Sequence, residues 1–163
     1  MTQPINNVHE LEKYLGFPIT RVQINPDSKN PYDETISYGL CQRFYNKEDE
    51  LQRAVIKTTN ILMQLINKEN DKKLIALYFS LLGNMYYILG DFKKSIGCFL
   101  KTLSYNKEDM TGWIELMFAI RANGDFGVFE DIIFNLEKIY IKWCNDKSEV
   151  LTKEKIFEII KNS

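Results

Sequence analysis

ALYFSLLGNMYYILGDFKKSIGCFLKTLSYNKED, residues 76–109, is the stretch that decides the fold. Its first half has apolar residues at the i, i+3, i+4, i+7 spacing of one helix face: Leu77, Tyr78, Leu81, Leu82, Met85, Tyr86 and Leu89. Gly90 suits the left-handed conformation that closes a helix, and Asp91 can cap the next helix. A second apolar face follows: Phe92, Ile96, Phe99, Leu100 and Leu103. We predict a helical hairpin whose apolar faces must be covered by other helices.

Length and composition predict one soluble domain over residues 1–163. The chain is 45% hydrophobic and 13% aromatic, which is enough for a core. Its formal net charge of −1 gives no overall basic field, so nucleic acid is not an expected partner. No apolar run reaches the roughly 18 residues of a membrane span, so we expect no membrane insertion. The first residues, MTQPINNVHE, lack the basic and apolar regions of a signal peptide. The expected location is the cytoplasm.

The three cysteines predict free thiols. Cys41, Cys98 and Cys144 are odd in number, and no two of them have the spacing of metal ligands. Free thiols fit a reducing compartment, and the apolar neighbours of Cys41 and Cys98 predict that both are small core residues. We expect neither a metal nor a cofactor.

Helical periodicity extends over most of the remaining chain. We predict helices over residues 7–15, 33–45, 47–68, 110–123 and 128–144, and a short final helix after a Thr152 cap. Before the second helix, Pro18, Pro26 and Pro31 flank or follow the segment ITRVQIN and exclude a helix there. We expect this arm to be extended and to pack through apolar side chains, although a loose linker is an alternative. Those side chains are Phe17, Ile19, Val22 and Ile24. The predicted fold class is all-α with an extended, proline-containing N-terminal arm.

An internal repeat with a period of 34 residues narrows the fold. Gly90-Asp91-Phe92 recurs as Gly124-Asp125-Phe126, and apolar positions match at the same offset. The matched pairs are Phe79 with Trp113, Leu82 with Leu116, Tyr86 with Ile120 and Phe99 with Ile133. The rest of the pattern is also present. The first helix has a large residue, then Leu-Gly, then an aromatic residue, the turn is Gly-Asp, and the second helix has a small residue, Ser95. The stretch therefore resembles the tetratricopeptide repeat (TPR) family.

This resemblance implies a right-handed superhelix of about seven to eight helices arranged as antiparallel pairs. The chain then divides into a short helix plus arm (1–32), a degenerate helix pair (33–75), a clear TPR unit (76–109), a divergent unit (110–145) and a capping helix (146–163). In the divergent unit, Met117 and Phe129 stand at the positions that match Gly83 and Ser95 of the clear unit. Bulky residues at positions where the clear unit has small ones imply a wider helix spacing.

The resemblance also implies where a partner binds. The first helices of successive TPR units line a concave groove, and in this chain the groove positions fall on two helices. They are Leu77, Ser80, Asn84, Tyr87 and Ile88, then Thr111, Ile114, Phe118, Arg121 and Ala122. We predict partner binding by Ser80, Asn84, Tyr87, Ile88, Ile114, Phe118 and Arg121, with Tyr87, Phe118 and Arg121 as anchors. Alternatively, the N-terminal arm or the last helix fills this groove and these residues are core.

Catalytic patterns are missing from the sequence, so we do not expect an enzyme. The single histidine, His9, stands alone, and the acidic run Glu48-Asp49-Glu50 is explained by the dipole at a helix start. The first hypothesis is a protein-interaction adaptor that binds a peptide or helix of another protein. The alternative is a small structural subunit of a larger hetero-complex, which uses the apolar outer face of residues 128–143.

Overall fold

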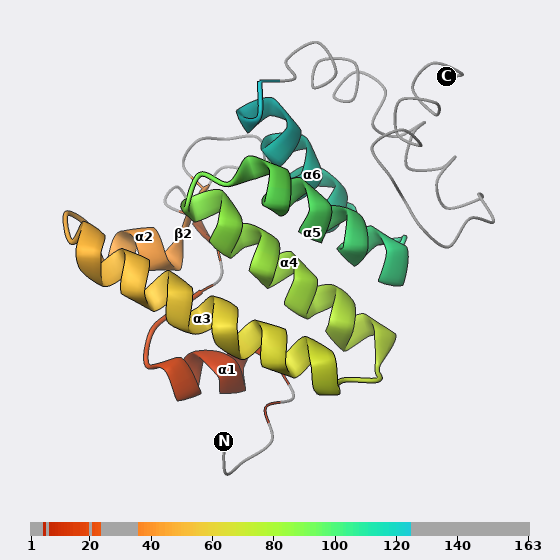
Figure 1. Cartoon of the computed structure of the whole chain (residues 1–163), viewed down its shortest axis with the longest axis horizontal. Helices are drawn as coiled ribbons and strands as arrows, with labels where there is room; N and C mark the ends of the chain where they lie inside the picture. The colour runs from red at the N-terminus through yellow and green to blue at the C-terminus, as the bar shows by residue number, and fades with distance from the viewer. Residues whose placement is uncertain (1–4, 6, 20, 24–35, 125–163) are drawn as a thin grey trace. The chain divides into compact units, whose positions relative to one another are not determined.

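A computed structural model gives the fold of residue 5 and of residues 7–19, 21–23 and 36–124 (Figure 1). The chain divides into two compact units, residues 1–61 and residues 62–163. This boundary falls within a helix and coincides with none of the segment boundaries predicted from the sequence. The helices predicted over residues 128–144 and after Thr152 lie outside the described residues.

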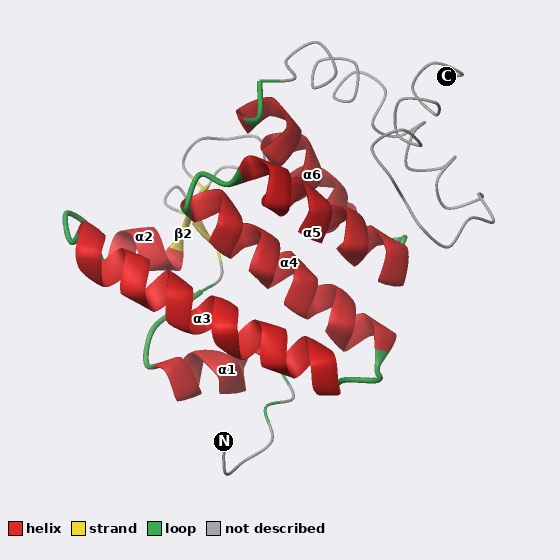
Figure 2. Ribbon diagram, in the orientation of Figure 1, coloured by secondary structure: helices red, strands yellow, loops and turns green. Residues whose placement is uncertain are grey.

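The described residues are helical except for two short strands (Figure 2), which agrees with the predicted all-α class at this coarse level. The elements are α1 (Val8–Leu15), β1 (Arg21–Gln23), β2 (Ile36–Tyr38), α2 (Gly39–Arg43), α3 (Glu48–Lys68), α4 (Lys72–Ile88), α5 (Phe92–Tyr105) and α6 (Met110–Ala122). A TPR superhelix of seven to eight helices stays a prediction.

In the first unit, α1 begins and ends as the sequence predicts. The Asn7 side chain accepts a hydrogen bond from the Glu10 N–H at 2.9 Å, and Gly16 closes the helix with a φ of 86°. Leu11 and Leu15 are buried. Just after the helix, Ile19 is fully buried and its N–H donates to Glu12 Oε2 at 3.1 Å. The start of the arm is therefore packed rather than loose.

The strand pair corrects one prediction. β1 lies in the predicted extended arm and pairs antiparallel with β2, with Arg21 opposite Tyr38 and Gln23 opposite Ile36. Residues 36–38 were expected to be helical, but here they form β2, and only the five residues of α2 follow. A β-branched and an aromatic residue in the run ISY favour a strand once a partner strand is available. The predicted helix pair of residues 33–75 therefore has only a short first helix.

The second unit contains α4, α5 and α6, and α5 packs against both α4 and α6 (Figure 1). Each helix has an aspartate as its N-cap: Asp71, Asp91 and Asp109 accept backbone hydrogen bonds from the first turn of the helix that follows. The predicted hairpin of residues 76–109 is confirmed as α4 and α5, although α4 begins four residues earlier than predicted, and the predicted helix over residues 110–123 is confirmed as α6.

Close packing of α4 on α5 depends on one glycine. A Cβ atom added to Gly83 would lie 2.6 Å from Phe99 Cε1, so the buried Phe99 ring occupies the space where a side chain would be. Two α5 hydroxyls also bond to the α4 backbone: Ser95 Oγ donates to the Gly83 carbonyl at 2.8 Å, and Thr102 Oγ1 donates to the Ala76 carbonyl at 3.1 Å. The small residues thus allow the two helix backbones to approach closely.

The ends of α4 and α6 are alike at an offset of 34 residues. Gly90 and Gly124 both have positive φ, at 79° and 91°. Gly90 N–H donates to the Tyr87 carbonyl and Gly124 N–H to the Arg121 carbonyl, both at 3.0 Å. The period found in the sequence is therefore also present in the backbone hydrogen bonds that end these two helices.

Candidate functional site

The candidate site lies where α4 faces α6, and a buried carboxylate joins the two helices there. Glu115 in α6 is only 4% exposed. Its Oε2 atom accepts a hydrogen bond from Ser80 Oγ at 2.7 Å, and its Oε1 atom accepts a longer one from Asn84 Nδ2 at 3.5 Å. Ser80 and Asn84 are one helical turn apart in α4. One side chain of α6 therefore bonds to two consecutive turns of α4.

Sequence reasoning did not single out Glu115. At the 34-residue offset it corresponds to Leu81, and both positions are buried. A carboxylate at a position whose counterpart is a core leucine is a signal that could have identified it, because a buried carboxylate requires hydrogen-bond donors. The two donors, Ser80 and Asn84, were both predicted as groove residues.

Two predicted binding residues are thus brought together by a residue that was not predicted. Asn84 is 3% exposed, and Ser80 is half-buried. Their polar groups point to Glu115, so the structure gives both residues a role in joining α4 to α6. Their predicted contact with a partner stays a prediction.

The other predicted residues lie along the same two helices. Tyr87 and Ile88 are half-buried near the end of α4, and the Tyr87 ring meets the Phe92 ring edge-on with centroids 5.2 Å apart. In α6, Ile114 and Phe118 are half-buried and Arg121 is exposed, at the i, i+4, i+7 spacing of one helix face. The further groove positions Leu77 and Ala122 are half-buried.

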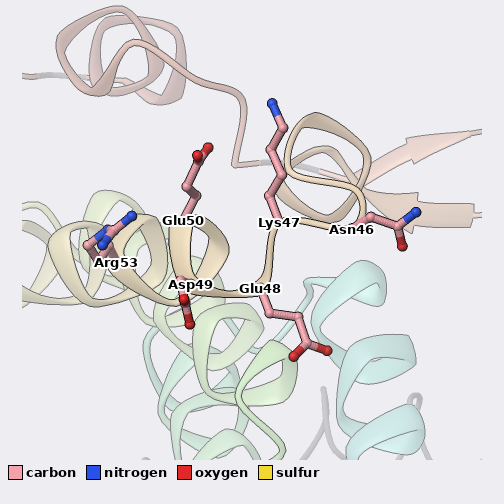
Figure 3. A pocket seen from close by; sticks show the side chains of 6 residues that line it. All are labelled: Asn46, Lys47, Glu48, Asp49, Glu50 and Arg53. Atoms are coloured by element: carbon pink, nitrogen blue, oxygen red, sulfur yellow. The ribbon is translucent and has the colours of Figure 1, made fainter.

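A separate hollow of about 560 Å³ lies at the start of α3 in the first unit. Its lining is entirely polar and exposed: Asn46, Lys47, Glu48, Asp49, Glu50 and Arg53. Figure 3 shows that the side chains diverge, with Lys47 and Glu50 on one side of the chain and Glu48 and Asp49 on the other. The three carboxylates therefore do not converge on one point, and their place at the helix start agrees with a dipole role.

The described cysteines are shielded thiols. Cys98 is buried and Cys41 is half-buried, and both are free. Burial, with a smaller contribution from Asp91, raises the pKa of Cys98 to about 12, and burial also raises the pKa of Cys41. Neither thiol is a ready nucleophile, since only the thiolate reacts. Among the described residues, no group of three His, Cys, Asp or Glu side chains is placed to hold a metal ion.

Comparisons of the chain with family models, curated proteins and solved structures give no match. Within the part of the chain that the structure describes, no helix combines the length and the apolar character needed to cross a membrane.

Proposed function

We propose that this chain is a non-enzymatic, TPR-like binding module that holds a peptide or helix of another protein against the α4–α6 face. The supporting observation is the pair of hydrogen bonds from Ser80 and Asn84 to the buried Glu115. Because these bonds fix α6 against α4 before a partner binds, less conformational entropy is lost on binding.

The side chains beside this bridge are of the types that dominate the binding energy of interfaces. Tyr87 and Phe118 are half-buried aromatic residues, and Arg121 is exposed in the last turn of α6. Tyr, Trp and Arg are enriched among the residues that lose most affinity when truncated, and large aromatic side chains bury much apolar area. On this proposal Tyr87 and Phe118 provide apolar contact, and Arg121 binds a carboxylate or backbone carbonyl of the partner.

The test measures the affinity of a partner, captured with the full chain as bait, for three alanine variants: Tyr87→Ala, Phe118→Ala and Arg121→Ala. We expect each to weaken binding by about tenfold or more in isothermal titration calorimetry. Tyr45→Ala and Arg53→Ala are matched controls, because Tyr45 is 75% exposed and Arg53 is exposed, both in the other unit. If all three variants bind as tightly as the wild type, the α4–α6 face is not the binding site.

A thermal melt of the free variants distinguishes the competing interpretation, in which a segment of the chain itself covers this face. In that case the alanine variants lower the Tm of the free protein and leave affinity unchanged. Tyr87→Phe serves as a further control, because it retains the ring that packs against Phe92.

A further inference from the structure

A second surface, on the outer side of α5, combines features that the folding of the helix does not require. Lys93, Gly97, Lys101 and Tyr105 follow one another at four-residue intervals, and all four are exposed. Residues four apart are neighbours on a helix surface, so these four residues form a continuous stripe. We call it the α5 stripe.

Gly97 is the unusual member of the stripe. A glycine in a helix interior costs about 1 kcal/mol relative to alanine, so its presence needs a reason. At Gly83 the reason is packing, because Phe99 fills the space of a side chain. At Gly97 a Cβ atom would meet nothing within 4 Å. Packing within the chain therefore does not explain Gly97, whereas close approach of another molecule to the α5 backbone would.

The two lysines on either side of Gly97 leave their positive charge available. Neither Lys93 nor Lys101 forms an ion pair with a described residue, and neither α4 nor α5 contains an acidic residue. The neighbouring Lys94 is different, because it pairs with Asp91 at 3.8 Å and lies 5.4 Å from the centre of the Tyr86 ring. The α5 stripe is thus a basic surface interrupted by a glycine.

Tyr105 ends the stripe with a fixed aromatic ring. It is 38% exposed, and its other face stacks on Phe79 with centroids 6.0 Å apart and an interplanar angle of 11°. Because Phe79 already holds the ring, a partner can contact Tyr105 without ordering it first.

We propose that the α5 stripe binds an acidic segment of a partner protein, with two carboxylate-bearing side chains on Lys93 and Lys101 and an apolar side chain on Tyr105. The lysines are eight residues, or about 12 Å, apart along the helix, which a short peptide spans. Nucleic acid fits less well, because such proteins contact many phosphates and this chain has a net charge of −1. An anionic membrane usually requires a larger basic cluster than two lysines. This proposal does not depend on the α4–α6 face.

The test uses a fluorescent peptide of about 16 residues, with glutamate at every fourth position and one terminal leucine, and a matched peptide with glutamine in place of glutamate. Fluorescence anisotropy with the full chain should show that the glutamate peptide binds at least about tenfold more tightly. The difference should shrink between about 50 and about 300 mM salt, because exposed charges are screened. Equal binding of the two peptides would overturn the proposal.

Two variants locate the contact on the stripe. Lys93→Glu with Lys101→Glu should weaken binding of the glutamate peptide by about tenfold or more, whereas Lys13→Glu with Lys57→Glu changes the net charge equally on exposed positions elsewhere and should not. Gly97→Gln should weaken binding while leaving the Tm unchanged or raised, because glutamine favours helix and fits the open space. Loss of binding in the control pair, or wild-type affinity of Gly97→Gln, contradicts the proposal.

Two further measurements separate other occupants of the stripe. Tighter binding to phosphatidylserine vesicles or to a single-stranded oligonucleotide than to the peptide would replace the proposed partner class. A second copy of this chain also has an acidic surface that complements the basic α5 stripe, formed by the exposed residues Glu48, Asp49 and Glu50. Salt-sensitive oligomers of the free protein in light scattering, lost in Lys93→Glu with Lys101→Glu, would assign the stripe to self-association instead.

Discussion

Replacing Gly83 and Gly97 separately by alanine tests how the second unit is packed. The two glycines lie in the interiors of neighbouring helices, α4 and α5, but their surroundings are opposite. Gly83 is buried against the Phe99 ring, and Gly97 faces open space. The same chemical change is therefore expected to have opposite effects on stability.

The magnitudes follow from two opposing terms. Alanine is favoured over glycine in a helix interior by about 1 kcal/mol, which applies at both positions. At Gly83 the new Cβ would lie 2.6 Å from Phe99 Cε1 and 2.9 Å from two further ring atoms. Overpacking of a core costs about 1–3 kcal/mol, and any backbone shift also weakens the buried bond from Ser95 to the Gly83 carbonyl, at about 1 kcal/mol. We expect Gly83→Ala to destabilise by about 2 kcal/mol and Gly97→Ala to stabilise by up to about 1 kcal/mol.

Urea denaturation followed by circular dichroism measures both free energies of unfolding. In a chain of this size 1 kcal/mol corresponds to a Tm change of about 2–4 °C, so thermal melts should show the same order. Adding Phe99→Leu to Gly83→Ala should recover part of the loss, giving a coupling energy of about 1 kcal/mol or more. If Gly83→Ala is as stable as Gly97→Ala, the Phe99 ring does not fill the space beside Gly83, and the close approach of α4 and α5 does not require a glycine there.

Three other predictions concern buried polar groups. In a double-mutant cycle, Ser80→Ala and Glu115→Leu, each of which removes the bond, should show a coupling energy of about 1 kcal/mol in urea denaturation, and strictly additive effects would contradict the bond between them. The pKa of the Cys98 thiol is raised in the folded chain, from 9.0 to about 12. The folded state therefore holds the thiol proton more tightly than the unfolded state. The stability that this contributes is present below about pH 9 and is lost as the pH rises towards 12. Between about pH 9 and pH 12, the free energy of unfolding should therefore fall less for Cys98→Ala than for the wild type. At pH 8, iodoacetamide should modify Cys98 in urea but not in the native protein, as read by mass spectrometry.

Local signals predicted most of the described helices because those signals are strong. Asn7 and Gly16 mark both ends of α1, and Asp91 and Asp109 act as caps where helix starts were predicted, whereas α4 begins after Asp71, four residues before the predicted start. The 34-residue period was visible because Gly90 and Gly124 have the same conformational requirement, a positive φ. Such requirements are met by a few residue types and can be found without tertiary information.

Predictions that depended on distant contacts were less successful. Residues 36–38 have a partner strand at residues 21–23, which local periodicity could not reveal, so a helix was predicted where β2 lies. The candidate site shows the same limit. Ser80 and Asn84 were identified from the expected groove positions, but their bonds depend on Glu115, which lies 35 and 31 residues away in sequence. A pattern of single positions identifies helix faces, whereas a hydrogen-bonded pair requires the packed fold.

The hydroxyls of Ser95 and Thr102 also determine how the second unit can move. Their acceptors, the carbonyls of Gly83 and Ala76, are separated by seven residues in α4, as the donors are in α5. Sliding or rotating α5 along α4 would break both bonds together, so the hairpin behaves as one rigid body. α6 is held to this body in two ways: Glu115 accepts hydrogen bonds from α4, and Gly112 lies close to α5, where an added Cβ would be 3.2 Å from Leu103 Cδ2. Moving α6 away from α4 would therefore break the Glu115 hydrogen bonds and the packing of α6 on α5 together, so the α4–α6 face is expected to stay preformed.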